Sequence, residues 1–146
     1  MDVVELEKLY KKINQFDLHM GYQLKIIAPG KLQYKLEIEK KHLSSPDTCH
    51  GGVLAGLMDN ILGVTALSHA ITQDCLCSTV EFKINYLNPA KLGDHLVGEG
   101  EIDFKGKSLV VTSGSIRNGE TLITKGIGTF NLYPFSKQVK ENWTQF

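Results

Sequence analysis

Residues 50–70 read HGGVLAGLMDNILGVTALSHA, and this stretch decides the fold of the chain. Between Val53 and Leu67, apolar residues occupy most positions around a helix, which predicts a helix that the rest of the protein encloses on most sides. Asp59, Asn60 and several glycines interrupt the run. The run is therefore too polar and too short to span a bilayer, and we expect a helix in the protein core and no membrane partner.

Alternating apolar and polar residues flank this helix on both sides and predict strands. The patterns at residues 23–26 and 32–39 are joined by Pro29-Gly30, as in an antiparallel hairpin. Four further strands are predicted after the helix, over residues 79–86, 95–104, 108–116 and 121–132, with turns at 105–107 and 118–119. Residues 4–16 carry apolar residues at 3-4-3 spacing and predict an amphipathic helix.

This order of elements predicts a single domain over residues 1–146. We expect an α+β fold in which a mostly antiparallel sheet of five to six strands curls around one long central helix, with an additional N-terminal helix. This description matches the hotdog fold, and periodicity alone leaves other α+β layouts open. At 146 residues the chain is long enough to bury a core without a structural metal ion or a disulfide.

The composition argues against several classes of protein. Lys and Arg number 16 and balance 16 Asp and Glu, and a net charge of zero argues against a nucleic-acid partner. Three cysteines are an odd number, whereas a disulfide framework needs an even one. The first 16 residues are charged and lack the apolar segment of a signal peptide. We therefore expect a cytoplasmic protein, and the spacing of Cys and His residues predicts no metal site.

Asp59 lies in the middle of the predicted core helix, where an ionised carboxylate is costly unless it is paired. Its neighbours on the helix surface have almost no side chain, namely Gly52, Ala55, Gly56, Gly63 and Ala66. Each glycine inside a helix costs roughly 0.5–1 kcal/mol of stability relative to alanine. The presence of several small residues on one face of this helix, which we call its small face, therefore requires an explanation. One reason is close packing of a second helix, and the other is a narrow ligand channel past the carboxylate; the two are compatible.

His50-Gly51-Gly52 stands at the start of the same helix, where unpaired N–H groups and the positive end of the helix dipole suit a developing oxyanion. Gly51 and Asp59 are eight residues apart, which is roughly 12 Å along a helix axis. One carbonyl group cannot be within bonding reach of both in a single chain. Two antiparallel helices related by a twofold axis would bring Gly51 of one chain near Asp59 of the other, which predicts a homodimer with shared sites.

The same residues resemble a known family. The motif at residues 50–52, then Asp59 and Gly63, and finally NPAKLGD at residues 88–94 resemble the PaaI-like branch of the hotdog-fold acyl-CoA thioesterases over about residues 21–132. The resemblance implies hydrolysis of an acyl-CoA thioester to a free acid and CoA, without a metal ion or cofactor. Pairing of dimers into a homotetramer is a further expectation from the family.

By position, the resemblance implies roles for four residues. Asp59 matches the catalytic carboxylate, acting as nucleophile or as base toward water. Gly51 matches the backbone N–H that polarises the thioester carbonyl, and His50 matches the residue that holds this turn. Thr79 matches a hydroxyl that assists the carboxylate or the water.

Two positions depart from the expected pattern. Relatives commonly carry Asn or Gln six residues before the motif histidine, where this chain has Ser44. Thr79 belongs to the polar face of its predicted strand, opposite the apolar face that holds Val80 and Phe82.

Substrate contacts are expected from the small face of the helix and from a cationic turn. The candidates are Ser44, Gly52, Gly56, Gly63, Lys105, Lys107 and Ser108. The turn would hold a phosphate of CoA, because the ligand is anionic and the turn is cationic; a solvated hairpin turn is the alternative. The side chains that could line the acyl slot are Tyr34, Met58, Phe82 and Tyr86.

Other functions remain as alternatives. A hotdog hydratase or dehydratase uses the same fold, and a non-catalytic acyl-CoA-binding module would bind without reaction, although a binder has no need of a costly carboxylate. Cys49 beside His50 is poorly arranged for proton transfer, because adjacent residues in an extended segment point to opposite sides. The remaining histidines expected at the surface are His19, His42 and His95.

Overall fold

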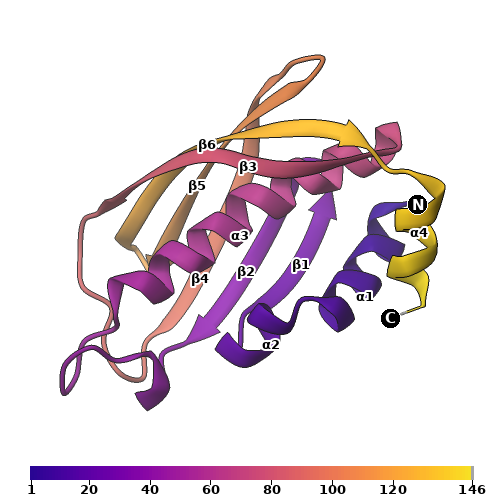
Figure 1. Ribbon diagram of the computed structural model, residues 1–146. Coiled ribbons are helices and arrows are strands. Elements are labelled where there is room, and N and C mark those ends of the chain that lie inside the picture. Colours follow the sequence, from indigo (N-terminus) through magenta and orange to yellow (C-terminus); the bar gives the residue numbers. More distant parts are fainter. Residues whose placement is uncertain (146) are drawn as a thin grey trace.

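The computed structural model describes residues 1–145 (Figure 1). The helices are α1 (Val3–Ile13), α2 (Gln15–Met20), α3 (Gly51–Ala70) and α4 (Lys137–Thr144), with short 3-10 turns at Lys40–His42 and Ile71–Gln73. The strands are β1 (Gln23–Ala28), β2 (Lys31–Glu37), β3 (Cys75–Tyr86), β4 (His95–Lys105), β5 (Leu109–Asn118) and β6 (Thr121–Pro134).

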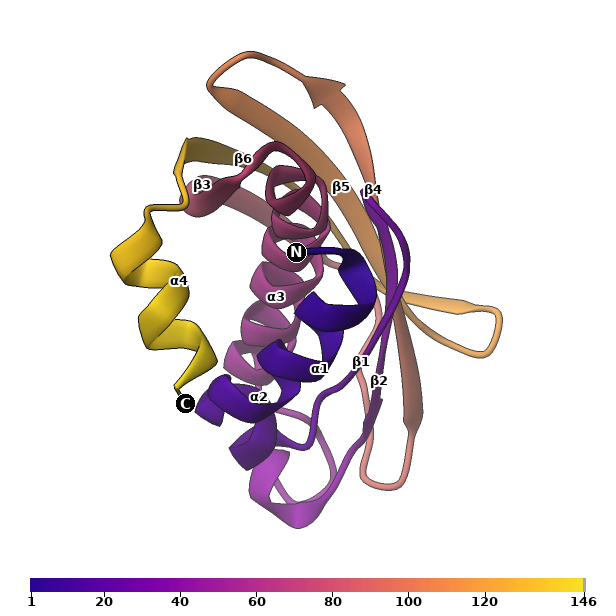
Figure 2. The ribbon, with the colours of Figure 1, turned by 90° about the vertical axis from the view of Figure 1, so that its right-hand side faces the viewer.

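The six strands form one antiparallel sheet in the order β1-β2-β4-β5-β6-β3. The sheet curls around α3, which packs on its concave face (Figures 1 and 2). This arrangement confirms the predicted α+β hotdog fold with a central helix. The strands begin and end within a few residues of the predicted bounds, except that β3 begins at Cys75 rather than at residue 79.

Close packing of α3 against the sheet follows from the residues at the contact. Leu57, Met58 and Ile61 are fully buried. Gly114 and Gly126 face them from β5 and β6, and a Cβ atom there would lie 2.9 Å from Ile61 Cγ2 and 2.8 Å from Met58 Cγ. Glycine in these strands therefore lets the helix approach the sheet closely.

The core helix is long and apolar enough to resemble a membrane-spanning helix. By length and composition alone, Gly51–Gln73 would suffice to cross a membrane, which corrects the expectation that it is too short and too polar. Within the fold, 61% of the most apolar 18-residue stretch of this helix is buried. A helix of this kind inside a curled sheet is a core helix, as predicted.

The N-terminal segment forms two helices rather than the single helix expected over residues 4–16. Asn14 leaves the helical conformation, ends α1, and accepts a hydrogen bond from the backbone N–H of Asp17 at the start of α2. The apolar spacing continues across the break, so periodicity alone did not reveal it. Both helices lie beside α3 next to β1 (Figure 2).

The C-terminal helix α4 was not expected from the sequence. Ser136 caps its first turn, and Trp143 contacts the ring of Phe135 edge-on at a centroid distance of 5.3 Å. Val139 and Trp143 both pack against the core. They are four residues apart in the sequence, and this spacing, which is typical of one face of a helix, could have predicted α4.

His42 is buried, which corrects the expectation of a surface position. Its Nδ1 accepts a hydrogen bond from the backbone N–H of Glu39 at 2.9 Å, and its Nε2 lies 2.7 Å from the carbonyl oxygen of Met20. The ring thus ties the segment before α3 to the end of α2. His19 and His95 are exposed, as expected.

Candidate active site

Asp59 lies half-buried midway along α3, beside the edge strand β3. The hydroxyl of Thr79 on β3 donates a hydrogen bond to Asp59 Oδ1 at 3.1 Å. Within residues 1–145 the Asp59 carboxylate accepts only this hydrogen bond. Its second oxygen, Oδ2, is therefore available to a ligand or water. The structure therefore brings together a carboxylate and a hydroxyl from two elements.

Thr79 reaches Asp59 because β3 contains a bulge, which corrects the placement expected from strand alternation. Thr79 pairs with Phe130 of β6 and Glu81 pairs with Thr129, so Val80 is an extra residue. The extra residue shifts the alternation by one position. Thr79 and Phe82 consequently both face α3, and Val80 is exposed.

A groove of about 140 Å³ runs past Asp59. Its lining residues are Tyr10, Asp59, Asn60, Gly63, Val64, Leu67, Cys77, Ser78, Thr79 and Phe130. Asp59, Gly63 and Leu67 are spaced by four residues and line one row along α3. We call this cavity the Asp59 groove; it fits the ligand channel that the small residues around Asp59 predicted.

Seven lining residues were not predicted as site residues, among them Tyr10, Cys77 and Asn60. Tyr10 comes from α1, which lies outside the recognised motifs, and Cys77 comes from the part of β3 that was not predicted. Burial and, to a smaller extent, the nearby Asp59 raise the pKa of Cys77 to about 12. Cys77 is therefore a neutral thiol near pH 7 and lines the groove without being a nucleophile. Asn60, next to Asp59 in the motif, was named only as an interruption of the apolar run.

Asn60 is held by a buried carboxylate on α2. Its Nδ2 donates to Asp17 Oδ1 at 2.7 Å, and the hydroxyl of Tyr34 donates to Asp17 Oδ2 at 2.8 Å. Asp17 is 5% exposed. Burial raises the pKa of Asp17 to about 6, although the hydrogen bonds from Tyr34 and Asn14 act in the opposite direction. This network fastens α2 to α3 one residue away from Asp59.

The raised pKa of Asp17 predicts a pH dependence of stability. Between about pH 4 and 6 the folded protein keeps a proton that the unfolded chain releases, so the free energy of unfolding falls as the pH rises through this range. Relative to the Asp17→Asn variant, the wild type should lose on the order of 2–3 kcal/mol between pH 4 and pH 7. Denaturant titrations of both proteins at several pH values measure this; parallel curves would contradict it.

The two glycines at the start of α3 differ in whether their backbone N–H is bound. His50 caps the helix, and its Nδ1 accepts the N–H of Gly52 at 2.7 Å. The N–H of Val53 donates to the carbonyl oxygen of His50 at 3.0 Å. In the part of the chain that the structure describes, the N–H of Gly51 has no acceptor. Of the two motif glycines, Gly51 is therefore the one whose N–H can meet an oxyanion.

Gly51 and Asp59 line different cavities. Gly51 lies in a second cavity of about 310 Å³, together with Cys49, Leu54, Tyr86, Leu87, Asn88, Pro89 and Ala90. The hydroxyl of Tyr86 donates to the carbonyl oxygen of Gly51 at 3.0 Å. The segment NPAKLGD thus borders the Gly51 cavity through its first three residues. Neither cavity contains both groups of a complete site.

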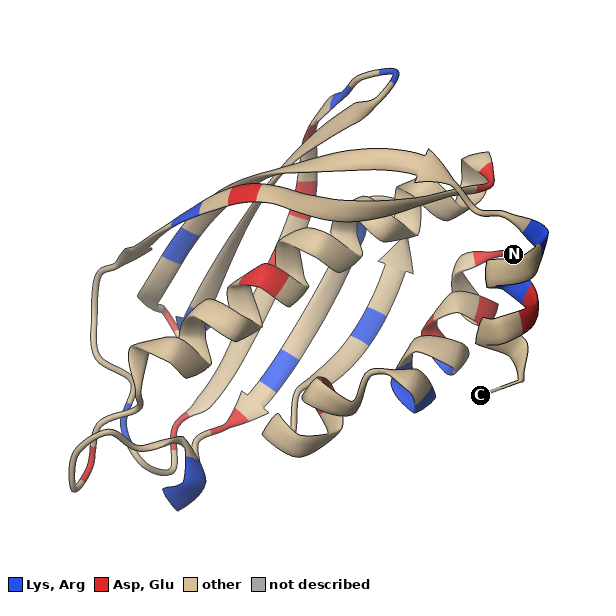
Figure 3. Cartoon of the chain, in the orientation of Figure 1, with Lys and Arg blue, Asp and Glu red and all other residues tan. Residues whose placement is uncertain are grey.

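Several predicted contact residues lie away from the Asp59 groove. The backbone N–H of Ser44 donates to the carbonyl oxygen of Thr48 at 3.0 Å, and Ser44 lines neither cavity. The turn with Lys105, Lys107 and Ser108 lies between β4 and β5 and projects beyond the sheet (Figure 3). It points away from the middle of α3, where Asp59, the acidic residue of this helix, is located. A single chain therefore does not bring this turn to Asp59.

The small face of α3 is partly covered by the protein's own side chains. A Cβ atom at Gly56 would lie 2.9 Å from Phe16 Cζ and 3.2 Å from the hydroxyl of Tyr22. Gly56 is therefore a packing position beneath α2, which corrects its prediction as a substrate contact. Gly52 is exposed and its N–H is bound to His50, whereas Gly63 does line the Asp59 groove.

The four side chains proposed for the acyl slot separate into different places. Tyr34 and Met58 are fully buried in the core, which corrects their assignment as pocket walls. Tyr86 borders the Gly51 cavity. Phe82 packs against the core from β3.

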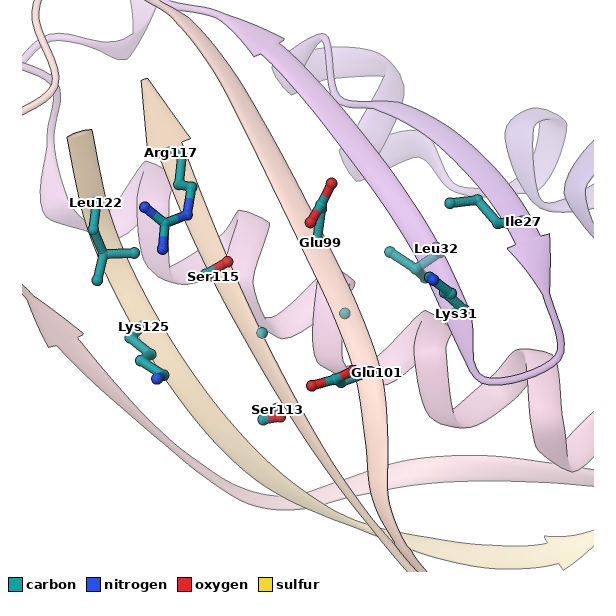
Figure 4. A pocket seen from close by; sticks show the side chains of 12 residues that line it. Ile27, Lys31, Leu32, Glu99, Glu101, Ser113, Ser115, Arg117, Leu122 and Lys125 are labelled. Carbon is teal, nitrogen blue, oxygen red and sulfur yellow. The ribbon is translucent and has the colours of Figure 1, made fainter. Parts of the chain in front are cut away.

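A larger cavity of about 510 Å³ lies on the face of the sheet away from α3 (Figure 4). Glu99 and Glu101 on β4 face Arg117 and Lys125 on β5 and β6 across it. The charges are mixed, and the cavity is separated from Asp59 by the sheet. Among residues 1–145 no cluster of three or more His, Cys, Asp or Glu side chains is suited to hold a metal ion.

Comparison with known proteins identifies the family. Residues 47–124 match the family described as the thioesterase superfamily. The human protein acyl-coenzyme A thioesterase 13 is 33% identical over 131 residues, which covers 88% of this chain and 92% of the human one. The chain is thus similar along most of its length to a curated thioesterase.

Two solved structures share the fold. A hypothetical thioesterase protein from Streptococcus pneumoniae, solved with coenzyme A, has a TM-score of 0.76 at 24% identity, covering 86% of this chain and 97% of that one. The PaaI protein of E. coli, from the phenylacetic acid degradation operon, has a TM-score of 0.77 at 18% identity, covering 86% and 89%. The sequence matches and the curled sheet around the HGG helix together show that this chain is a thioester hydrolase of the thioesterase superfamily with the hotdog fold.

Proposed function

We propose that this enzyme hydrolyses acyl-CoA thioesters at sites that two subunits share, each built from Asp59 of one chain and the Gly51 N–H of the other. The observation that carries the proposal is the hydrogen bond from Thr79 to Asp59 in a groove that also contains Asn60 and Gly63. The relative named acyl-coenzyme A thioesterase 13 and the neighbour solved with coenzyme A support an acyl-CoA as the substrate.

The geometry suits two routes of hydrolysis. Asp59 Oδ2 attacks the thioester carbonyl carbon, the CoA thiolate leaves, and water cleaves the resulting anhydride to release the acid. Alternatively, Asp59 takes a proton from water, the water oxygen attacks the carbonyl carbon, and the CoA thiolate leaves with a proton as the free thiol. In both routes the carbonyl oxygen becomes negative, and the Gly51 N–H at the helix N-terminus would stabilise it.

The need for two chains follows from distance. Asp59 and Gly51 are eight residues apart on one straight helix, roughly 12 Å along its axis, whereas each must lie about 3 Å from the same carbonyl group. Two α3 helices that run antiparallel about a twofold axis would place each Gly51 near the other chain's Asp59. The edge strand β3 supports this arrangement, because a 12-residue edge with exposed Val80 and Tyr86 is the kind of edge that a partner strand covers.

Thiol release from acyl-CoA tests the reaction. We expect wild-type protein to release one CoA thiol per acyl-CoA consumed, followed with a thiol-reactive dye over a panel of phenylacetyl-, benzoyl- and straight-chain acyl-CoAs. A spectral change in an enoyl-CoA without thiol release would instead indicate a hydratase. Tight binding of acyl-CoA with neither signal would indicate a binding module. Either result would overturn the proposed function.

A further inference from the structure

We infer that Tyr10 of α1 limits the size of the acyl group that the Asp59 groove accepts. The inference rests on the proposed function, since it concerns the same groove. It assigns a role in acyl selection to the N-terminal helix, which lies outside the motifs that define the family.

Tyr10 forms one wall of the Asp59 groove. The floor is the row on α3 that includes Gly63 and Leu67, and Cys77 and Thr79 of β3 line the groove from the sheet. At Gly63 the floor has no side chain, and a Cβ atom there would lie 3.3 Å from the ring of Phe130. An acyl chain that enters beside Asp59 would therefore pass over Gly63 and meet the side chain of Tyr10.

The surroundings of the Tyr10 hydroxyl support this placement. Burial raises the pKa of Tyr10, and the charges of Asp17, Cys77 and Asp59 raise it further. Two of these groups, Cys77 of β3 and Asp59 of α3, line the groove together with Tyr10, so the ring extends from α1 toward these two elements. Tyr10 is consequently a neutral, half-buried phenol beside the substrate path.

The wall is rigid because α1 and α2 are fastened to the rest of the protein. Leu6 on α1 is fully buried, and Glu7 Oε2 accepts the backbone N–H of Ile26 on β1 at 2.7 Å. On the other side of Tyr10, Asp17 of α2 accepts hydrogen bonds from Asn60 and Tyr34. These contacts fix the backbone of α1 from which the Tyr10 side chain extends.

The volume of the groove gives the size of the acyl group. The groove measures about 140 Å³, and a cavity of about 150 Å³ accommodates one benzene molecule. Within one chain the groove therefore has room for a single ring or a chain of about six carbon atoms beyond the thioester carbonyl. A longer chain would collide with Tyr10.

Replacing Tyr10 tests the inference. We expect the Tyr10→Ala variant to increase the ratio of kcat/KM for dodecanoyl-CoA to that for hexanoyl-CoA by on the order of 10-fold or more. Tyr10→Phe should keep the chain-length preference of the wild type, because the ring remains. Lys12→Ala, at an exposed position of the same helix, is the matched control for α1 and should leave the ratio unchanged.

The outcomes separate this inference from the function on which it rests. If Tyr10→Ala fails to fold, Tyr10→Leu replaces it and should shift the same ratio in the same direction. Folded Tyr10→Ala or Tyr10→Leu protein with the wild-type ratio would overturn the role of Tyr10, and hydrolysis would still stand. A wild type that cleaves dodecanoyl-CoA as efficiently as hexanoyl-CoA would also overturn it. A wild type that cleaves no acyl-CoA would refute the proposed function and this inference together.

Discussion

The Asp59→Asn variant is expected to lose at least about 100-fold in kcat toward every acyl-CoA that the wild type hydrolyses. Asparagine has nearly the same shape as aspartate and can still accept the hydrogen bond that Thr79 donates to Oδ1. It can neither attack a carbonyl group nor take a proton from water at neutral pH. The substitution therefore removes the chemistry and keeps the packing of the groove.

The measurement is steady-state thiol release by wild-type and variant protein. Asp103→Asn is the matched control, because Asp103 is an exposed aspartate on β4 that lines none of the cavities described above. It should retain wild-type turnover. Circular dichroism and the unfolding midpoint show whether each variant is folded. Turnover near the wild-type rate in folded Asp59→Asn protein would remove Asp59 from the mechanism.

Heterodimers isolated from a mixture of two inactive variants are expected to have about half the activity of the wild-type dimer. One chain carries Asp59→Asn, and the other carries Gly51→Pro, which removes the backbone N–H. In a heterodimer with shared sites, one site contains both lesions and the other contains neither. Each variant alone forms dimers in which every site carries one lesion.

The structure indicates that Gly51→Pro will fold. Gly51 is the first residue of α3, a position where proline is favoured because its missing N–H has no partner within the helix. His50 before it has φ −64° and ψ 134°, the extended conformation that a following proline requires.

The matched control is Gly51→Ala, which keeps the N–H. A Cβ atom at this position meets the Tyr86 ring at 3.5 Å, an ordinary van der Waals distance. Gly51→Ala should therefore retain far more activity than Gly51→Pro. If isolated heterodimers of Asp59→Asn and Gly51→Pro chains stay inactive although both variants fold, the two groups do not share a site across the interface. The oxyanion donor must then be sought within one chain.

Several features of this protein could not be predicted from local patterns. The break at Asn14 is invisible to periodicity, because the apolar spacing of residues 4–16 suits one continuous helix. The burial of His42 depends on the carbonyl oxygen of Met20, 22 residues earlier in the chain. Gly56 was predicted as a ligand contact, but Phe16 and Tyr22 lie over it once α2 packs against α3.

The sequence by itself determined the architecture and the main candidate residues. Apolar periodicity is a local property, so it located the core helix at residues 50–70, within one residue of α3, and the hairpins on either side. A carboxylate and glycines in an apolar helix are likewise conspicuous in the sequence, and they identified Asp59 and Gly51.

Only the tertiary structure decided which side chains meet around Asp59. The alternation of β3 predicted that Thr79 faces away from the core, and the bulge at Val80 reverses this. Tyr10, Asn60 and Cys77 come to the groove from three different elements. Such contacts depend on strand register and helix docking, which the whole core fixes and no short stretch of sequence encodes.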